Sequence, residues 1–198
     1  MVWLAIGVFV VLMVSVGPAE AIWVDLTPPQ LQAAIAHGRS SYEQWRGAGR
    51  PIDNLDPEYV VELKPEVGRA MLFTEFAKLA LEARRWMAID QQLTPQDVRR
   101  LLAPVRGRLL FSVTVVGSNR DFLRHYSVRL KQSGVQKEPA RWKVFRGTRA
   151  PDLPSRFVAH AQYTFSLEGL SSTAPVSLVL RGPDGGELRF DFDLSRLR

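Results

Sequence analysis

The chain has 198 residues and no cysteine, which excludes thiol nucleophiles, cysteine-ligated zinc, disulfide bonds and lipid attachment through a cysteine. Its hydrophobic fraction of 46% is that of a globular protein, so core packing alone must hold the fold together. The net charge of +6 favours anionic over cationic partners.

The first 21 residues have the pattern of a secretory signal peptide. No charged side chain occurs in Met1–Gly17, and the segment Leu4–Val14 is strongly apolar. Pro18 ends this run before it reaches the roughly 20 residues that a membrane-spanning helix needs. Ala19-Glu20-Ala21 then supplies small residues at the two positions that a signal peptidase reads. We expect cleavage before Ile22, export to the periplasm or the extracellular space, and no transmembrane segment after cleavage. The alternative interpretation is an uncleaved membrane anchor, which also implies export.

Residues 22–105 are predicted to form a helical region. Thr27-Pro28-Pro29 and Thr94-Pro95 each place a hydroxyl group before a proline, which marks the start of a helix. Between them, Gly47–Pro57 contains the breakers of a loop. The strongest helical pattern covers about Val67–Ile89, where apolar side chains recur at a period of about 3.6 residues.

Residues 106–198 are predicted to form an antiparallel β region, because apolar and polar side chains alternate there. The clearest run is Leu109, Phe111, Val113 and Val115. Gly182–Gly186 has the composition of a hairpin turn. The alternation indicates about six short strands, and it places Trp142 in the core together with Val144.

The order of these segments predicts the α+β class, with N-terminal helices packed on a C-terminal antiparallel, β-sandwich-like sheet of about six strands. The connection Val105–Gly107 between the two regions is very short. Intimate packing in one domain is therefore favoured over two free modules.

The basic charge is concentrated in the β region. Residues 22–100 contain 10 basic and 11 acidic side chains, whereas residues 101–198 contain 16 basic and 8 acidic ones. We select Arg129, Lys131, Arg141 and Lys143, on predicted strand faces, as candidate binding residues. An exported protein meets anionic glycans, lipid headgroups and acidic proteins, so no nucleic acid partner is expected. A merely solvated basic face is the alternative interpretation.

The sequence identifies no catalytic residue. His37, His125 and His160 do not have the spacing of metal ligands and are predicted to be solvated surface side chains, the last two on strand faces. Asp191 and Asp193 are the best carboxylate pair, since alternate residues of a strand point the same way about 7 Å apart. Together with Glu187 and Arg189, however, they also match an ordinary solvated strand face. We expect no metal and no cofactor.

The primary hypothesis is an exported, non-catalytic envelope or secreted protein whose basic β region binds an anionic partner. One alternative is a hydrolase that acts on an envelope glycan or ester. Another is a carrier that holds an apolar ligand between the helices and the sheet. Either alternative requires a deep pocket with converging polar groups, whereas a binding module needs only an exposed patch.

Overall fold

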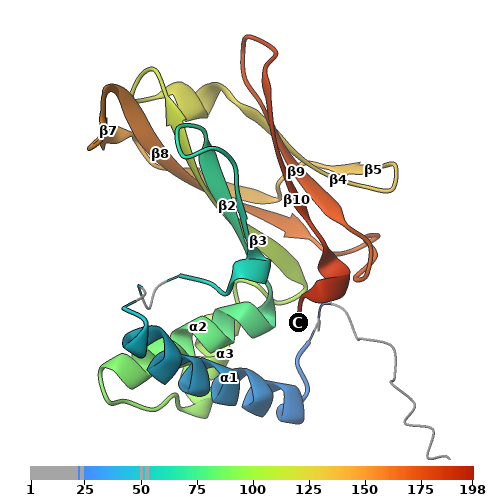
Figure 1. Cartoon of the computed structure of the whole chain (residues 1–198). Coiled ribbons are helices and arrows are strands. Elements are labelled where there is room, and N and C mark those ends of the chain that lie inside the picture. Colours follow the sequence, from blue (N-terminus) through green and yellow to red (C-terminus); the bar gives the residue numbers. More distant parts are fainter. Residues whose placement is uncertain (1–21, 23–24, 50, 52–53) are drawn as a thin grey trace, which may run out of the picture.

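The computed structural model describes residues 22, 25–49, 51 and 54–198. The helices lie together at one end of a two-layered β-sandwich (Figure 1). The predicted α+β class, with helices packed on an antiparallel sandwich, is confirmed. The predicted signal peptide, residues 1–21, lies outside the described residues. Within the described part of the chain, no helix has both the length and the apolar character needed to cross a bilayer.

Two of the helices begin where the sequence predicts them. Among the described residues, the α-helices are α1 (Pro28–Gly47), α2 (Glu75–Ala88) and α3 (Pro95–Leu102). Before α3, the hydroxyl oxygen of Thr94 accepts a hydrogen bond from the backbone N–H of Asp97 at 3.2 Å, and the carboxylate of Asp97 accepts one from the backbone N–H of Thr94 at 3.1 Å. Both bonds satisfy N–H groups that a helix end leaves free. Short 3-10 turns cover Pro57–Tyr59, Phe122–His125 and Leu194–Arg196.

The predicted helix over Val67–Ile89 is wrong in its first part. Gly68–Phe73 forms strand β2, and α2 begins only after Thr74, whose hydroxyl oxygen accepts a hydrogen bond from the N–H of Ala77 at 3.1 Å. The helical and the strand periods both fit so short an apolar run. This segment forms a strand because it pairs with the next strand of the sheet.

Among the described residues, the strands form two antiparallel sheets of six and four strands, more than the six or so expected in all. The larger sheet contains β1 (Val60–Glu62), β2 (Gly68–Phe73), β3 (Arg108–Gly117), β8 (Leu153–Ser166) and β6 (Arg141–Val144) in this spatial order, with β7 (Thr148–Ala150) also paired to β8. The smaller sheet contains β10 (Glu187–Phe192), β9 (Val176–Arg181), β4 (Ser127–Gln132) and β5 (Val135–Lys137) in this order.

The main core lies between the two sheets. Leu109, Phe111, Val113 and Val115 of β3 point inward as predicted and are fully buried. The ring of Phe111 meets that of Phe192 on β10, with 5.4 Å between centroids. Because successive strand residues point to opposite faces, the alternate residues of each sheet lie on its outer face. The outer faces of the two sheets therefore point away from each other.

A second, smaller core joins the helices to the larger sheet. Ala34, Phe76, Leu79 and Leu102 pack there, with Leu110 on the outer face of β3 against them. Close approach of α1 and α2 depends on Gly38, since a Cβ atom at this position would lie 2.2 Å from the carbonyl oxygen of Ala80. The helices thus cover one end of this outer face.

Candidate functional site

The structure separates the four predicted binding residues into two pairs. Arg129 and Lys131 alternate with buried residues on β4, so they lie on the outer face of the smaller sheet. Arg141 and Lys143 lie on β6, on the outer face of the larger sheet. Because these faces point away from each other, one flat partner cannot touch both pairs.

The outer face of the smaller sheet brings a different set of basic side chains together. Strand register arranges its side chains from β4, β9 and β10 in three rows: Ser127, Arg181 and Glu187; Arg129, Val179 and Arg189; Lys131, Ser177 and Asp191. We call the side chains of Arg129, Lys131 and Arg181 the basic face. Sequence reasoning missed Arg181, although it directly follows the alternating apolar residues Val176, Leu178 and Leu180, which was a usable signal.

The cations of this sheet differ in how they are paired. Arg189 donates to Asp191 at 2.8 Å and to the hydroxyl of Ser177 at 2.9 Å. Burial alone would raise the pKa of Asp191, but hydrogen bonds from Ser177 and Arg189 and the charge of Arg189 bring it below the usual range. Arg129 donates to the amide oxygen of Gln136 at 3.3 Å. Within the described residues, the charges of the basic face have no carboxylate in ion-pair contact.

A small hollow of about 140 Å³ lies at the basic face. Arg129, Lys131 and Arg181 line it together with Ser127, Val179 and Glu187. Such a hollow admits a carboxylate, phosphate or sulfate group but not a whole small molecule, for which pockets of about 300 Å³ or more are typical.

The two predicted carboxylates do not form a reactive pair. Asp191 is held by Arg189 and Ser177 as described, on the outer face of β10. Asp193 lies beyond the end of the strand, where its carboxylate accepts hydrogen bonds from the backbone N–H of Ser195 at 3.0 Å and from its hydroxyl at 2.6 Å. One carboxylate is thus bound in an ion pair and the other caps a turn. Among the described residues, no three side chains of His, Asp or Glu are grouped as a metal site.

The histidines occupy three different environments. His125 is exposed, as predicted, but it lies in a 3-10 turn and not on a strand. His160 lies on β8, where Thr114 is within 2.9 Å of its Nδ1 atom. Burial, and next the charge of Arg69, lower the pKa of His160. The prediction that His37 is a solvated surface side chain is wrong, because it is half-buried and its Nε2 atom lies 2.6 Å from Asp56.

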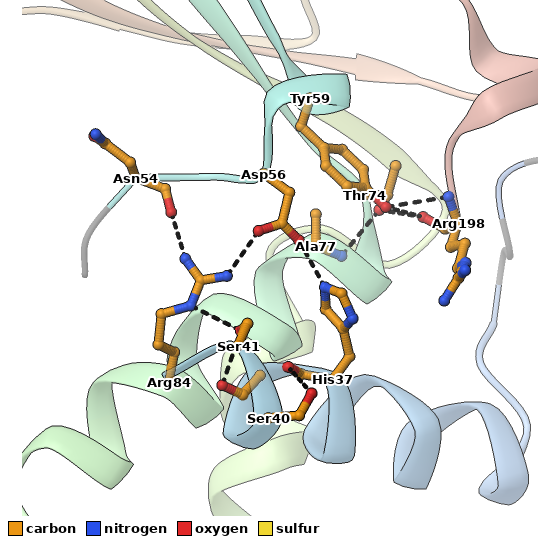
Figure 2. A network of polar contacts seen from close by, with 11 residues as sticks. His37, Ser40, Ser41, Asn54, Asp56, Tyr59, Thr74, Ala77, Arg84 and Arg198 are labelled. Carbon is orange, nitrogen blue, oxygen red and sulfur yellow. Dashed lines mark hydrogen bonds and ion pairs between the residues drawn. The ribbon is translucent and has the colours of Figure 1, made fainter. Parts of the chain in front are cut away.

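A buried arginine organises the contacts around His37 (Figure 2). Arg84, on α2, is 1% exposed. Its guanidinium donates to the carboxylate of Asp56 at 2.9 Å, to the carbonyl oxygen of Asn54 at 2.8 Å and to the hydroxyl of Ser41 at 3.0 Å. It also stacks on the ring of Trp45, 4.2 Å from the centroid. Arg84 therefore ties α1, α2 and the segment that leads into β1 together.

This cluster is best explained as structural. Burial alone would raise the pKa of Asp56, but the hydrogen bond from His37 and the charges of His37 and Arg84 outweigh it, so the pKa lies below the usual range. The nearby hydroxyl of Ser41 donates to the carbonyl oxygen of Gly38 at 3.0 Å and accepts from Arg84. It is therefore already occupied on both sides and is not positioned as a nucleophile activated by His37.

Close by, the C-terminal end of the chain is fixed to the helices (Figure 2). The hydroxyl of Thr74 donates to the backbone oxygen of Arg198 at 2.6 Å, and the hydroxyl of Tyr59 accepts from the backbone N–H of Arg198 at 3.1 Å. Burial raises the pKa of Tyr59 to about 12, so this hydroxyl stays protonated at physiological pH. These contacts hold the segment after β10 against the start of α2.

A larger hollow lies between the helices and the outer face of the larger sheet. Its volume is about 500 Å³. Trp45, Leu55, Val60 and Met71 give it apolar walls, and Glu62 and Arg69 add one charge of each sign. This is the place where the carrier hypothesis puts an apolar ligand.

Comparison with known proteins adds little to this geometry. No family model and no curated protein matches the chain. Among solved structures, the archaellum periplasmic stator protein FlaG from Sulfolobus acidocaldarius is 16% identical, with 43% of this chain and 86% of that chain covered and a TM-score of 0.29. The IgNAR antibody domain C1 is 7% identical, with 67% and 97% covered and a TM-score of 0.33. Likeness at these TM-scores is too slight to support a function.

Proposed function

We propose that this chain is an exported, non-catalytic protein whose β-sandwich binds an anionic partner through the basic face. The observation that carries the proposal is the contrast between two groups of cations. In the helices, Lys78 and Arg85 both contact Glu82 at 2.8 Å. On the basic face, Lys131 and Arg181 have no such carboxylate within the described residues.

Unpaired cations held side by side by a rigid sheet repel one another and attract an anion from solution. The small hollow among them supplies donors from three side chains on two neighbouring strands. Arginine donates in a fixed fork geometry that suits carboxylate and phosphate groups. Export rests on residues 1–21, and the compartment selects glycans, lipid headgroups and acidic proteins as the available anions.

The test compares two sets of neutralising substitutions in protein purified from its native host. Arg129→Gln, Lys131→Gln and Arg181→Gln remove the basic face, and Arg141→Gln with Lys143→Gln is the control on the opposite outer face. At about 0.5 kcal/mol for each exposed charge contact, the triple variant should bind polyglutamate about tenfold more weakly. The control should bind nearly as the wild type does.

Salt supplies the second arm of this test. Binding should weaken as the ionic strength rises to 0.15 M, where the screening length is about 8 Å. Equal binding by the triple variant and the wild type, or binding that is insensitive to salt, would refute the proposal. Circular dichroism must show that the variants keep their fold.

A second function, an apolar-ligand carrier, is favoured by the hollow of about 500 Å³ beside Met71. Met71→Trp should fill part of this space and reduce the binding of a fluorescent fatty acid. Fatty-acid binding that is absent in the wild type, or equal in the two proteins, removes this candidate.

A further inference from the structure

Exposed apolar side chains are concentrated in one stretch of the molecule. Among the described residues, the large hydrophobic side chains that stay exposed are Ile89, Val135, Trp142 and Phe145. Three of the four therefore lie in residues 135–145, which pass from the smaller sheet to the larger one. Trp142 is the most exposed of them, at 67%. This corrects the prediction that it belongs to the core.

The sheet topology explains why Trp142 is uncovered. It pairs with Tyr163 of β8, a core residue, so Trp142 is on the side of β6 that faces the other sheet. That sheet does not cover it, because β5 pairs only with Leu130–Gln132 of β4. In the part of the chain that the structure describes, the first half of β4 is left as an open edge, and Trp142 lies beside this edge.

A groove of about 350 Å³ runs along the open edge. Trp142, Tyr126 and Pro139 give it flat, largely apolar walls, and Arg124, Arg129 and Glu138 add charged groups. Burial, and next the charge of Asp184, raise the pKa of Tyr126, so its hydroxyl is a hydrogen-bond donor at neutral pH. The volume lies in the usual range for small-molecule sites.

Arg129 belongs to two sites at once. It lines this groove together with Trp142, and it lines the hollow of the basic face together with Lys131 and Arg181. The two depressions therefore meet at Arg129 and the neighbouring Ser127, which line both of them. They form a path from the outer face of the smaller sheet, around its open edge, to the indole ring of Trp142.

From this geometry we propose that the path binds a linear acidic glycan, one sugar ring of which packs on Trp142 while carboxylate or phosphate groups meet Arg129 and the basic face. The proposal rests on the proposed function and names the class of anion. An aromatic face offers a large flat area to the C–H face of a sugar ring. The arginines match the acid groups, and the Glu138 carboxylate accepts hydrogen bonds from sugar hydroxyls.

The shape of the path favours a chain over the other anions. A bilayer surface is flat, whereas the path turns around the edge of a sheet. Single-stranded nucleic acid also combines rings with negative charge. It carries far fewer hydroxyl groups than a glycan does, so it offers few hydrogen-bond donors to the Glu138 carboxylate. An acidic peptide has the charge but no ring that repeats along the chain.

The experiment measures the affinity of protein purified from its native host for four probes by calorimetry. These are an alginate oligosaccharide, in which every ring carries a carboxylate, polyglutamate of equal charge, oligothymidylate, and phosphatidylglycerol vesicles. Trp142→Ala removes the ring and leaves every charge in place. Ile89→Ala, which removes another exposed apolar side chain at the helical end, is the matched control.

We expect alginate to bind most tightly. Trp142→Ala should weaken alginate binding about tenfold, a loss of about 1.4 kcal/mol, and should leave polyglutamate binding within about twofold. Ile89→Ala should change neither. Both variants should fold, because exposed side chains contribute little to stability.

The remaining outcomes are distinct. If polyglutamate binds and the basic-face triple variant loses it, but Trp142→Ala leaves alginate binding unchanged, the glycan inference is wrong and the proposed function stands. Tightest binding of oligothymidylate or of vesicles also overturns the glycan inference. Failure of all four probes to bind overturns both.

Discussion

Replacing Arg84 with methionine should destabilise the protein by about 3 kcal/mol, because it removes one partner of a largely buried ion pair and leaves the carboxylate of Asp56 with less compensation. The guanidinium of Arg84 bonds to Asp56 at 2.9 Å and to the carbonyl oxygen of Asn54 at 2.8 Å. The side chain of Asp56 is only 16% exposed. Methionine has a similar length but supplies none of these donors.

The size of the effect follows from what remains after the substitution. Breaking a buried pair costs about 3–5 kcal/mol, and the lower end applies because His37 still contacts Asp56 at 2.6 Å. The carbonyl group of Asn54, which is only partly buried, also loses its donor and adds to this cost. In a chain of this size, about 3 kcal/mol lowers the melting temperature by roughly 6–12 °C.

Urea denaturation followed by circular dichroism measures the change, with Arg100→Met as the control. Arg100 contacts Asp97 at 2.8 Å, a distance close to that of the Arg84 pair, but its side chain is 73% exposed. Exposed pairs add little, so this variant should unfold like the wild type. If Arg84→Met is no less stable than Arg100→Met, the cluster around Arg84 does not hold the helical part together.

Three further outcomes are expected. The native protein should begin at Ile22 in N-terminal sequencing, and a protein that keeps residues 1–21 and fractionates with membranes would contradict the signal-peptide prediction. Gly38→Ala should destabilise by about 1–3 kcal/mol in thermal unfolding, because its Cβ atom would meet the carbonyl oxygen of Ala80 at 2.2 Å, whereas Gly47→Ala, with open space around it, should not. Asp56→Asn should be less stable than the wild type at pH 7. The difference in unfolding free energy should disappear as the pH falls below the usual carboxyl pKa of 3.8 and through the lower folded pKa of Asp56, because a lowered pKa stabilises the fold only while the carboxylate is charged. A difference that does not depend on pH would show that the charge of Asp56 is not what stabilises the fold.

The sequence predicted those features of the fold that depend on residues close together in the chain, such as helix starts and strand faces. The start of α3 at Thr94 and the inward set on β3 follow from capping chemistry and from alternation. Strand β2 could not be separated from the helix after it, because its four apolar residues, Ala70–Phe73, fit both periods and only the pairing of β2 with β3 settles the matter. Arg84 was missed because a basic side chain on a helix gives no sequence signal that it will be buried.

The candidate site was predicted less well, for a topological reason. Arg129 and Arg141 are close in the sequence and lie on strands of similar pattern, so they were expected to act together. Between them, however, the chain passes from the smaller sheet to the larger one. The outer faces of the two sheets point in opposite directions, so outward side chains before and after the crossing lie on opposite sides of the molecule. Residues 137–141 contain no pattern that predicts this change of sheet. The same crossing left Trp142 uncovered when its alternation with Val144 indicated burial.

The distribution of paired charges separates the scaffold from the candidate binding surface. In the helical part, Arg84 contacts Asp56 at 2.9 Å and thereby fixes α2 to the segment that leads into β1. Lys78 contacts Glu82 at 2.8 Å within α2 itself. On the smaller sheet the order is set by backbone pairing and by the core beneath it, so its outer side chains are not needed for the fold. Lys131 and Arg181 can therefore remain without carboxylate partners at little cost to stability. Substitutions in the cluster around Arg84 should therefore lower stability, whereas substitutions on the basic face should weaken binding. A basic-face variant that unfolds more easily than the wild type would show that this division is wrong.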